Sequence, residues 1–275
     1  MHACLEATGA YGDTLAADLP EAGHTVSQVN PAAIKAYAQS RLSRPKNDSV
    51  EAALLASFCA ERRAAAWQPP APELREWQAL VRRLDSLIER HTMEESHLCA
   101  GIAVEAVRES VAELLAHLSE QIKRTEARIR SSIDSHPDLK RQRELLDSIP
   151  GLGETTAAAR LAEVPEIKQY RSARPVAAFA GLVPRERQSG SSVRGRVRLS
   201  KIGNTRLRKA RYFPAVTALR CSPFFQKWVE GLRRRGKSKM SVIGAALRKL
   251  VHLAYGVRKT GRPFDPEWAQ KQKIA

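Results

Sequence analysis

Hydrophobic and polar positions in the first 67 residues follow short strand-like and helix-like patterns in turn. The expected elements are strands over 2–6 (HACLE) and 24–30 (HTVSQVN) and helices over 11–22, 31–40 and 49–66. Pro31 suits the first turn of its helix, and Asp48 is expected at or near the N-cap of the last helix. This order of elements predicts an α/β domain over residues 1–68.

The middle of the chain predicts two long helices. Pro69, Pro70 and Pro72 mark the boundary before them. Apolar residues then step by three and four, as in the seam of a coiled coil. The seam consists of Leu74, Trp77, Val81, Leu84 and Ile88, followed by Val107, Val111, Leu114, Leu118 and Ile122. We expect two antiparallel helices, about 73–100 and 102–136, that meet near Gly101. Such a pair is usually structural, and here it is also a candidate for joining subunits.

Residues 148–164 (SIPGLGETTAAARLAEV) predict a helix, a tight turn and a second helix. Pro150 fixes its own φ, and Gly151 and Gly153 permit backbone conformations closed to other residues. Thr155 lies at the start of the second helix, whose free N–H groups suit a phosphate. This is the helix-hairpin-helix pattern, which holds a nucleic-acid backbone without reading its sequence. A turn that merely joins two packed helices is an equally good interpretation of these residues.

Charge is distributed unevenly along the chain. The net charge is +17, but residues 168–275 carry 27 lysines and arginines against four acids, a net charge of +23. The remainder has 19 bases and 25 acids, a net charge of −6. A basic half of this size indicates a polyanionic partner, and nucleic acid is favoured over a membrane surface. No run of about 18 apolar residues occurs, so we expect no transmembrane helix, and the N-terminal residues do not lead us to expect a signal peptide. The four cysteines form no CxxC pair and are interpreted as reduced thiols.

Ser189 lies in a Gln-Ser-Gly segment surrounded by arginines. These are Arg185, Arg187, Arg194, Arg196 and Arg198. We expect a flexible glycine turn here, on which the serine hydroxyl could attack a phosphodiester while the arginines hold the phosphate and favour the alkoxide. On composition alone, such a serine is more often part of a polar loop.

Five more basic residues and an asparagine follow on an expected turn and helix that should face the nucleic-acid backbone. They are Lys201, Asn204, Arg206, Arg208, Lys209 and Arg211. A second cluster is expected in a loop and contains Arg233, Arg234, Arg235, Lys237 and Lys239. The segment 240–257 (MSVIGAALRKLVHLAYGV) predicts an amphipathic helix that is mostly core.

Three carboxylates of the N-terminal domain are candidate metal ligands. Glu6 ends a strand, and Asp48 and Glu51 are three residues apart, so that they could share one helical face. Clustered carboxylates can hold Mg²⁺ for phosphoryl-transfer chemistry. The simpler interpretation makes Asp48 an N-cap and Glu51 a partner of the helix dipole, and composition alone favours it.

Five motifs in order resemble one protein family. They are EATG with Tyr11, VNPAAIKAYAQSRLSRPKND, IPGLGETTA, FAGLVPRERQSG and SKIGNTRLRKARY. Over about residues 3–262 the chain resembles the insertion-sequence transposases of the one-ten family, which are DEDD recombinases guided by a bridge RNA. The resemblance implies an α/β plus α fold: a partial RuvC-like domain of RNase H type over 1–68, a coiled-coil helical linker over 69–145, a mainly helical transposase domain with a helix-hairpin-helix over 146–262, and a tail over 263–275.

The resemblance also assigns roles to individual residues. In the family, four N-terminal acids bind Mg²⁺, and a C-terminal serine forms a covalent phosphoserine link with DNA. Glu6 then matches the second acid, Asp48 the third and Glu51 the fourth, which is usually Asp; Ser189 matches the nucleophile. The residues expected to contact nucleic acid are Gly151, Gly153, Thr155, Arg185, Arg187, Arg194, Arg196, Arg198, Lys201, Asn204, Arg206 and Arg208.

The family's first acid lies on a strand upstream of EATG, and this sequence does not contain it. We therefore expect either a misplaced start codon or an N-terminally truncated copy, with impaired strand transfer. The leading hypothesis is a Mg²⁺-dependent recombinase that binds DNA and a guide RNA as a dimer or tetramer, in the bacterial cytoplasm and associated with the nucleoid. The alternatives are a catalytically inactive remnant that only binds nucleic acid, and a repair or junction-binding protein that uses the helix-hairpin-helix.

Overall fold

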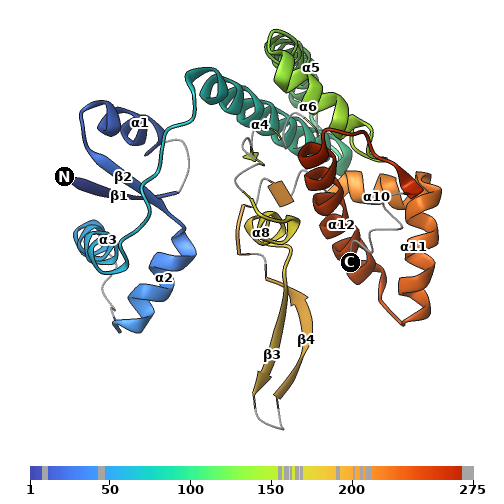
Figure 1. Cartoon of the computed structure of the whole chain (residues 1–275). Helices are drawn as coiled ribbons and strands as arrows, with labels where there is room; N and C mark the ends of the chain where they lie inside the picture. Colours follow the sequence, from blue (N-terminus) through green and yellow to red (C-terminus); the bar gives the residue numbers. More distant parts are fainter. Residues whose placement is uncertain are drawn as a thin grey trace. The chain divides into compact units, whose positions relative to one another are not determined.

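The structure is a computed structural model. It describes residues 1–7, 12–42, 47–153, 157, 161, 163–164, 167, 170–189, 193–200, 202–204, 207–208 and 212–267, with the backbone alone for 187–189, 193, 194 and 196. The chain divides into two compact units, Met1–Pro72 and Glu73–Ala275 (Figure 1). The predicted linker and C-terminal domain therefore belong to the same unit. The described part is mostly helical and contains two small sheets.

The first unit is a two-stranded parallel sheet with three helices. Its elements are β1 (His2–Glu6), α1 (Asp13–Glu21), β2 (Thr25–Val29), α2 (Pro31–Ser40) and α3 (Asp48–Arg62). β1 pairs with β2 from His2 opposite Thr25 to Glu6 opposite Val29. Ala16 and Ala17 of α1 and Val26 of β2 are buried. Both predicted strands and all three predicted helices are confirmed.

The predicted bounds of α3 need two corrections. Its N-cap is Asn47 rather than Asp48, because the Asn47 side chain accepts a hydrogen bond of 2.9 Å from the backbone N–H of Val50. The helix also ends at Arg62, four residues earlier than predicted, since Arg63 adopts a left-handed backbone conformation with φ of 47°.

Two long helices begin the second unit, as predicted: α4 (Pro72–Ala100) and α5 (Glu105–Asp134). They are separated at Gly101, whose φ is +93°. His91 of α4 hydrogen-bonds Ser119 of α5 at 3.0 Å, and Trp77 shares the core with Ile133, which is the register of an antiparallel pair. Within the seam, Trp77, Val81, Leu84 and Leu118 are buried. Towards the turn between the helices, the seam residues Ile88, Val107 and Leu114 are exposed, as are the neighbouring Met93 and Val104.

The rest of the second unit is built on one long helix. Its elements are α6 (Pro137–Asp147), α8 (Ala173–Phe179), β3 (Pro184–Ser189), β4 (Val193–Leu199), α10 (Tyr212–Cys221), α11 (Pro223–Arg234) and α12 (Lys239–Thr260). Eleven residues of α12 are buried, and α6, α8, α10 and α11 all pack on it (Figure 1). The prediction that 240–257 is a mostly buried amphipathic helix is therefore confirmed.

Gln188 and Ser189, which were expected in a flexible glycine turn, instead belong to a strand of an antiparallel β-hairpin, and Gly190 lies outside the described residues. β3 pairs with β4 from Pro184 opposite Leu199 to Ser189 opposite Val193. The signal for these strands was present in the sequence: Arg194, Arg196 and Arg198 alternate with Val193, Gly195, Val197 and Leu199. This period of two is typical of a strand with two different faces. The hairpin extends away from the helices of its unit (Figure 1).

The turn after α6 is packed against another helix of the unit. Gly151 has φ of +87°, and a Cβ on it would lie 2.5 Å from the Pro214 carbonyl oxygen and 2.8 Å from the Ala218 nitrogen of α10. Gly153 faces open space, and a Cβ added there would have nothing within 4 Å. The backbone N–H of Ala157 donates to the Gly153 carbonyl at 2.9 Å. Gly151 is therefore a packing residue.

We predict that Gly151→Ala lowers the free energy of unfolding by at least about 2 kcal/mol, because the new methyl group meets backbone atoms that cannot move aside and φ is unfavourable. Gly153→Ala is the matched control and should stay within about 0.5 kcal/mol of the original protein. Urea unfolding followed by circular dichroism measures both. Equal stabilities of the two variants would contradict the packing role of Gly151.

Candidate functional site

The β3–β4 hairpin displays cations directly opposite one another. Arg185 of β3 pairs with Arg198 of β4, and both side chains are exposed. Like charges opposite each other on neighbouring strands destabilise a hairpin. Glu186 is the one acid in the described part of the hairpin, and it too is exposed. The arrangement therefore suits an anionic ligand that offsets the repulsion.

The backbone of Ser189 is placed at the outer end of this hairpin. It is the last residue of β3 and lies opposite Val193. The side chains of Ser189, Arg187, Arg194 and Arg196 are outside the described part of the chain, so their predicted roles stay predictions. Ser189 nevertheless ends the strand that carries Arg185, and both belong to the same sequence motif.

The inner end of the hairpin is fixed to the core. The Ser200 N–H donates to the Val183 carbonyl at 2.8 Å, and Leu199 lies against Gly244 of α12. Arg248 of α12 donates to the Leu182 carbonyl at 3.2 Å. The buried helix α12 therefore sets the position of the basic strands.

Two residues predicted to contact nucleic acid are used within the fold. The Asn204 side chain accepts a hydrogen bond of 2.9 Å from the Leu207 N–H and donates one to the Glu163 carboxylate. Arg208 donates to the Ala180 carbonyl at 3.3 Å. Both side chains thus stabilise the turn that follows the hairpin. Lys201, Arg206 and Thr155 lie outside the described residues.

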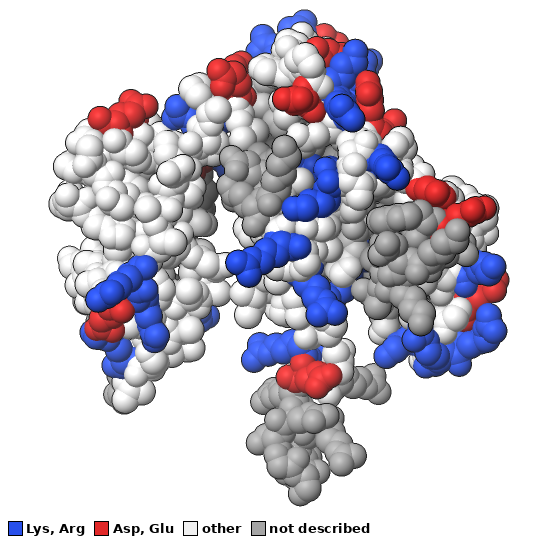
Figure 2. Space-filling view, viewed as in Figure 1, with Lys and Arg blue, Asp and Glu red and all other residues white. Residues whose placement is uncertain are grey.

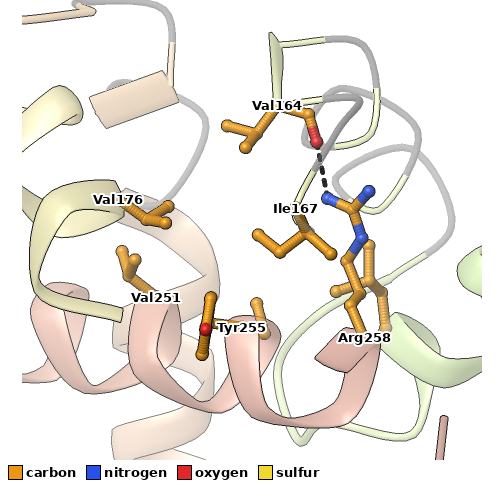
Figure 3. A pocket seen from close by; sticks show the side chains of 8 residues that line it. Val164, Ile167, Val176, Val251, Tyr255 and Arg258 are labelled. Atoms are coloured by element: carbon orange, nitrogen blue, oxygen red, sulfur yellow. Dashed lines mark hydrogen bonds between the residues drawn. The ribbon is translucent and has the colours of Figure 1, made fainter. Parts of the chain in front are cut away.

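Arg258 is a buried cation that joins three segments of the second unit (Figure 3). Its Nη1 donates to the Val164 carbonyl at 2.6 Å, and its Nε and Nη2 donate to the Gln142 side chain at 3.0 and 2.6 Å. Burial lowers the pKa of Arg258 to about 10, so it stays charged at neutral pH. The cavity beside it holds about 20 Å³ between apolar side chains, including Val176 and Val251, which is room for about one water molecule. Arg258 is therefore structural.

Two further titratable residues of α12, Lys249 and His252, are buried in the second unit. The ammonium group of Lys249 lies 5.7 Å from the Phe224 ring and 6.0 Å from the Trp228 ring, and burial lowers its pKa. His252 is 8% exposed, and burial, helped by Arg248, Lys249 and Arg174, lowers its pKa to about 4. His252 is therefore neutral at physiological pH.

The three candidate carboxylates all belong to the first unit. Glu6 ends β1 and is partly buried, whereas Asp48 and Glu51 lie exposed in the first turn of α3. β1 and α3 pack together. Within the described part of the chain, however, no three His, Cys, Asp or Glu side chains come close enough to hold a metal ion. The magnesium ligands stay a prediction.

The structure brings together two cysteines that are far apart in the sequence. Cys4 of β1 neighbours Cys59 of α3, and burial together with Cys59 raises the pKa of the Cys4 thiol to about 11. Both are free thiols. Sequence spacing carried no signal for this contact, because it depends on how β1 packs on α3.

Comparison with known proteins identifies the family. A DEDD transposase model matches residues 1–103, and the model described as "Transposase IS116/IS110/IS902 family" matches residues 143–230. The pilin gene-inverting protein of Moraxella lacunata is 34% identical over 270 residues, which cover 96% of this chain and 82% of that protein. The chain belongs to the IS110 family of transposases. The transposase for insertion sequence element IS1328 of Yersinia enterocolitica is 25% identical over 286 residues, covering 91% of this chain and 82% of the relative.

Membership in the IS110 family implies a DNA substrate and a divalent metal ion. A transposase of insertion elements acts on DNA, and the DEDD domain implies the use of a divalent metal ion. No helix in the described residues of the transposase is long and apolar enough to cross a membrane.

We predict that His252 makes this IS110-family transposase less stable in acid. Its folded pKa of about 4 lies below the ordinary value of 6.5, so the unfolded chain takes up the proton first and stability is lost as pH falls below 6.5. The loss between pH 7 and pH 5 is up to about 2 kcal/mol. His252→Leu should remove this part of the pH dependence, as measured by urea unfolding at both pH values. An equal loss in both proteins would show that His252 titrates normally.

Proposed function

We propose that this transposase cuts and rejoins DNA with Ser189 as the nucleophile, on nucleic acid held by the arginines of the β3–β4 hairpin. The observation that carries the proposal is the exposed pair Arg185 and Arg198, which face each other across the hairpin whose first strand ends at Ser189. Cations that repel one another in the free protein bind a phosphate between them favourably.

The chemistry required of Ser189 is a phosphoryl transfer. Its hydroxyl oxygen attacks the phosphorus of one DNA phosphodiester, the bond to one deoxyribose oxygen breaks, and that oxygen receives a proton. The product is a phosphoserine ester, and attack by a new deoxyribose hydroxyl on this ester rejoins the DNA and releases the serine. Arginines beside the phosphate stabilise the charge that develops on its oxygens.

Glu6, Asp48 and Glu51 are proposed to hold Mg²⁺ in a partial RuvC-like domain. The parallel β1–β2 pair with its helices and the match to a DEDD transposase support this assignment. A bound Mg²⁺ would stabilise charge on the attacking and leaving oxygens.

The proposed partners are DNA, a guide RNA and further copies of this chain. The resemblance to bridge-RNA-guided recombinases and the +23 charge of residues 168–275 support a guide RNA as well as DNA. The name of the Moraxella relatives describes the inversion of a pilin gene, which supports DNA recombination. A homo-oligomer, dimer or tetramer, is supported by the exposed Val107 and Leu114 on the seam of α5. The site of action is the bacterial cytoplasm, at the nucleoid.

A protein that only binds nucleic acid is the second candidate. It is favoured by one observation, the lack of a three-carboxylate group among the described residues. Binding by the basic hairpin would persist in such a protein, whereas strand cleavage would not.

We predict that Ser189→Ala abolishes the covalent protein–DNA adduct and leaves DNA affinity within about threefold, since phosphate contacts supply most of the affinity. Ser191→Ala and Ser192→Ala are the matched controls and should retain most adduct. The measurement is trapping of labelled element-end DNA, with the element's own noncoding RNA, on denaturing gels.

Three results would change this assignment. Adduct from Ser189→Ala, together with its loss from a control variant, would move the nucleophile. Loss of DNA binding by Ser189→Ala would make the serine a structural contact. No adduct from the original protein, with normal binding, would support the second candidate.

A further inference from the structure

A second basic surface lies where α11 meets α12, and we call it the α11–α12 basic turn. It consists of Arg233, Arg234, Arg235, Lys237 and Lys239. All five side chains are exposed, and the sequence has no acid between Glu230 and Asp265. Figure 2 shows blue side chains gathered at the lower right, over the end of α11. From the sequence alone this cluster was expected in a loop, with no role assigned to it.

The structure corrects that loop to a tight turn between two helices. Arg233 and Arg234 are the last residues of α11, and Lys239 is the first residue of α12. The N–H groups of Gly236 and Lys237 donate back to carbonyls of α11, to Arg233 at 2.9 Å and Leu232 at 3.2 Å. Ser238 caps α12. These backbone hydrogen bonds fix the Cα positions of the five residues relative to the two helices.

Beneath the turn, a small apolar cluster joins the two helices. Val229 and Leu232 of α11 pack against Val242 of α12. The buried face of α11 contains Phe225, Val229 and Leu232, whereas Arg233 and Arg234 at its end are exposed. Apolar packing therefore fixes the two helix ends that flank the basic turn.

Stability does not explain these charges. Arg235 donates from its Nε to the Gly231 carbonyl at 3.0 Å and so complements the end of α11. The other four side chains make no hydrogen bond or ion pair within the described part of the chain. Lys237 and Lys239 also stand at the amino end of α12, where a helix disfavours cations, and its first turn has no acid to offset them. An anionic partner would relieve this repulsion.

The basic turn and the β3–β4 hairpin are at the same end of the second unit. Leu199 at the base of β4 lies 3.3 Å from the position of a Cβ on Gly244, which is five residues, about 7.5 Å of helix, from Lys239. Figure 1 shows the hairpin and the turn between α11 and α12 at the lower end of the unit. Cations from both elements can therefore follow one phosphate backbone.

We propose that the α11–α12 basic turn is a second phosphate-contact surface, which extends the contact made by the hairpin along the same nucleic-acid duplex. Lysine and arginine on an exposed turn bind phosphates without reading bases, so the contact is independent of sequence. The proposal rests on the nucleic-acid binding in the proposed function but not on Ser189 or on any metal ion. The phosphate backbone belongs either to the DNA or to a paired segment of RNA, and the test separates the two.

The test is the salt dependence of duplex binding by the full chain. The variant Arg233→Gln, Arg234→Gln, Lys237→Gln removes three cations from the turn. The matched control Lys123→Gln, Arg124→Gln, Arg128→Gln removes three exposed cations from α5. Fluorescence anisotropy with a DNA duplex of about 30 base pairs gives Kd at several salt concentrations between about 50 and 300 mM. Each lost phosphate contact lowers the slope of log Kd against log salt by about 0.9.

We expect the turn variant to lower this slope by about 2 to 3 and to weaken binding at least about tenfold at about 100 mM salt, while the control changes the slope by less than about 1. Replacing Arg233 and Arg234 by Lys should restore the slope, because the charge is kept. Unchanged circular dichroism of all variants excludes misfolding as the cause. Equal slopes for the turn variant and the control would overturn the proposal.

Two further measurements identify the nucleic acid that the turn contacts and test the hairpin separately from the turn. If the turn variant binds duplex RNA more weakly but binds duplex DNA normally, the turn contacts RNA, and the reverse result assigns it to DNA. Either outcome supports a phosphate contact. The variant Arg185→Gln, Arg198→Gln tests the hairpin alone. If only the hairpin variant loses affinity, the turn proposal fails and the proposed function stands; if only the turn variant does, the hairpin contact fails and the turn proposal stands.

Discussion

The burial of α12 is the interaction on which the second unit depends. Leu250, Val251 and Leu253 are almost fully buried at its centre, and four other helices pack around it. Full burial of side chains of this size contributes roughly 1.5 to 3 kcal/mol each. The base of the hairpin packs on this helix, and Arg248 and Arg258 of the helix donate hydrogen bonds to the Leu182 and Val164 carbonyls. The position of α12 therefore also sets where the basic hairpin lies.

A core of this kind allows the surface to carry charges that destabilise the free protein. The pair Arg185 and Arg198 repels across the hairpin, and Lys237 and Lys239 oppose the dipole of α12. Local rules are usually broken at functional sites, where a ligand compensates. The second unit separates these two features: apolar residues of α12 and its neighbours form the core, and the exposed strands and turn carry the positive charge.

Local patterns in the sequence predicted those elements whose signals are local. The helix at 31–40, the two long helices and the buried C-terminal helix all follow from apolar spacing and helix-start residues. The β3–β4 hairpin was missed because β3 (PRERQS) has no aliphatic or aromatic residue to mark an alternating pattern, and only β4 alternates arginines with apolar residues. Asn47 replaced Asp48 as the N-cap, since either side chain can cap and only the backbone geometry decides. Gly151 illustrates a different limit: its close approach to Pro214 and Ala218 of α10 joins residues far apart in the chain, which no local pattern records.

Phosphate binding by the opposed arginines of the hairpin, as proposed, would have a consequence for how the transposase finds its target. Attraction to phosphates acts on any DNA, so most copies in a cell would be held weakly on chromosomal DNA at any moment. Movement along the double helix by sliding and short hops then replaces a three-dimensional search through solution. Such a protein samples sites near its first point of contact with DNA before it reaches distant ones, and the distance explored in one visit shortens as the intracellular salt concentration rises.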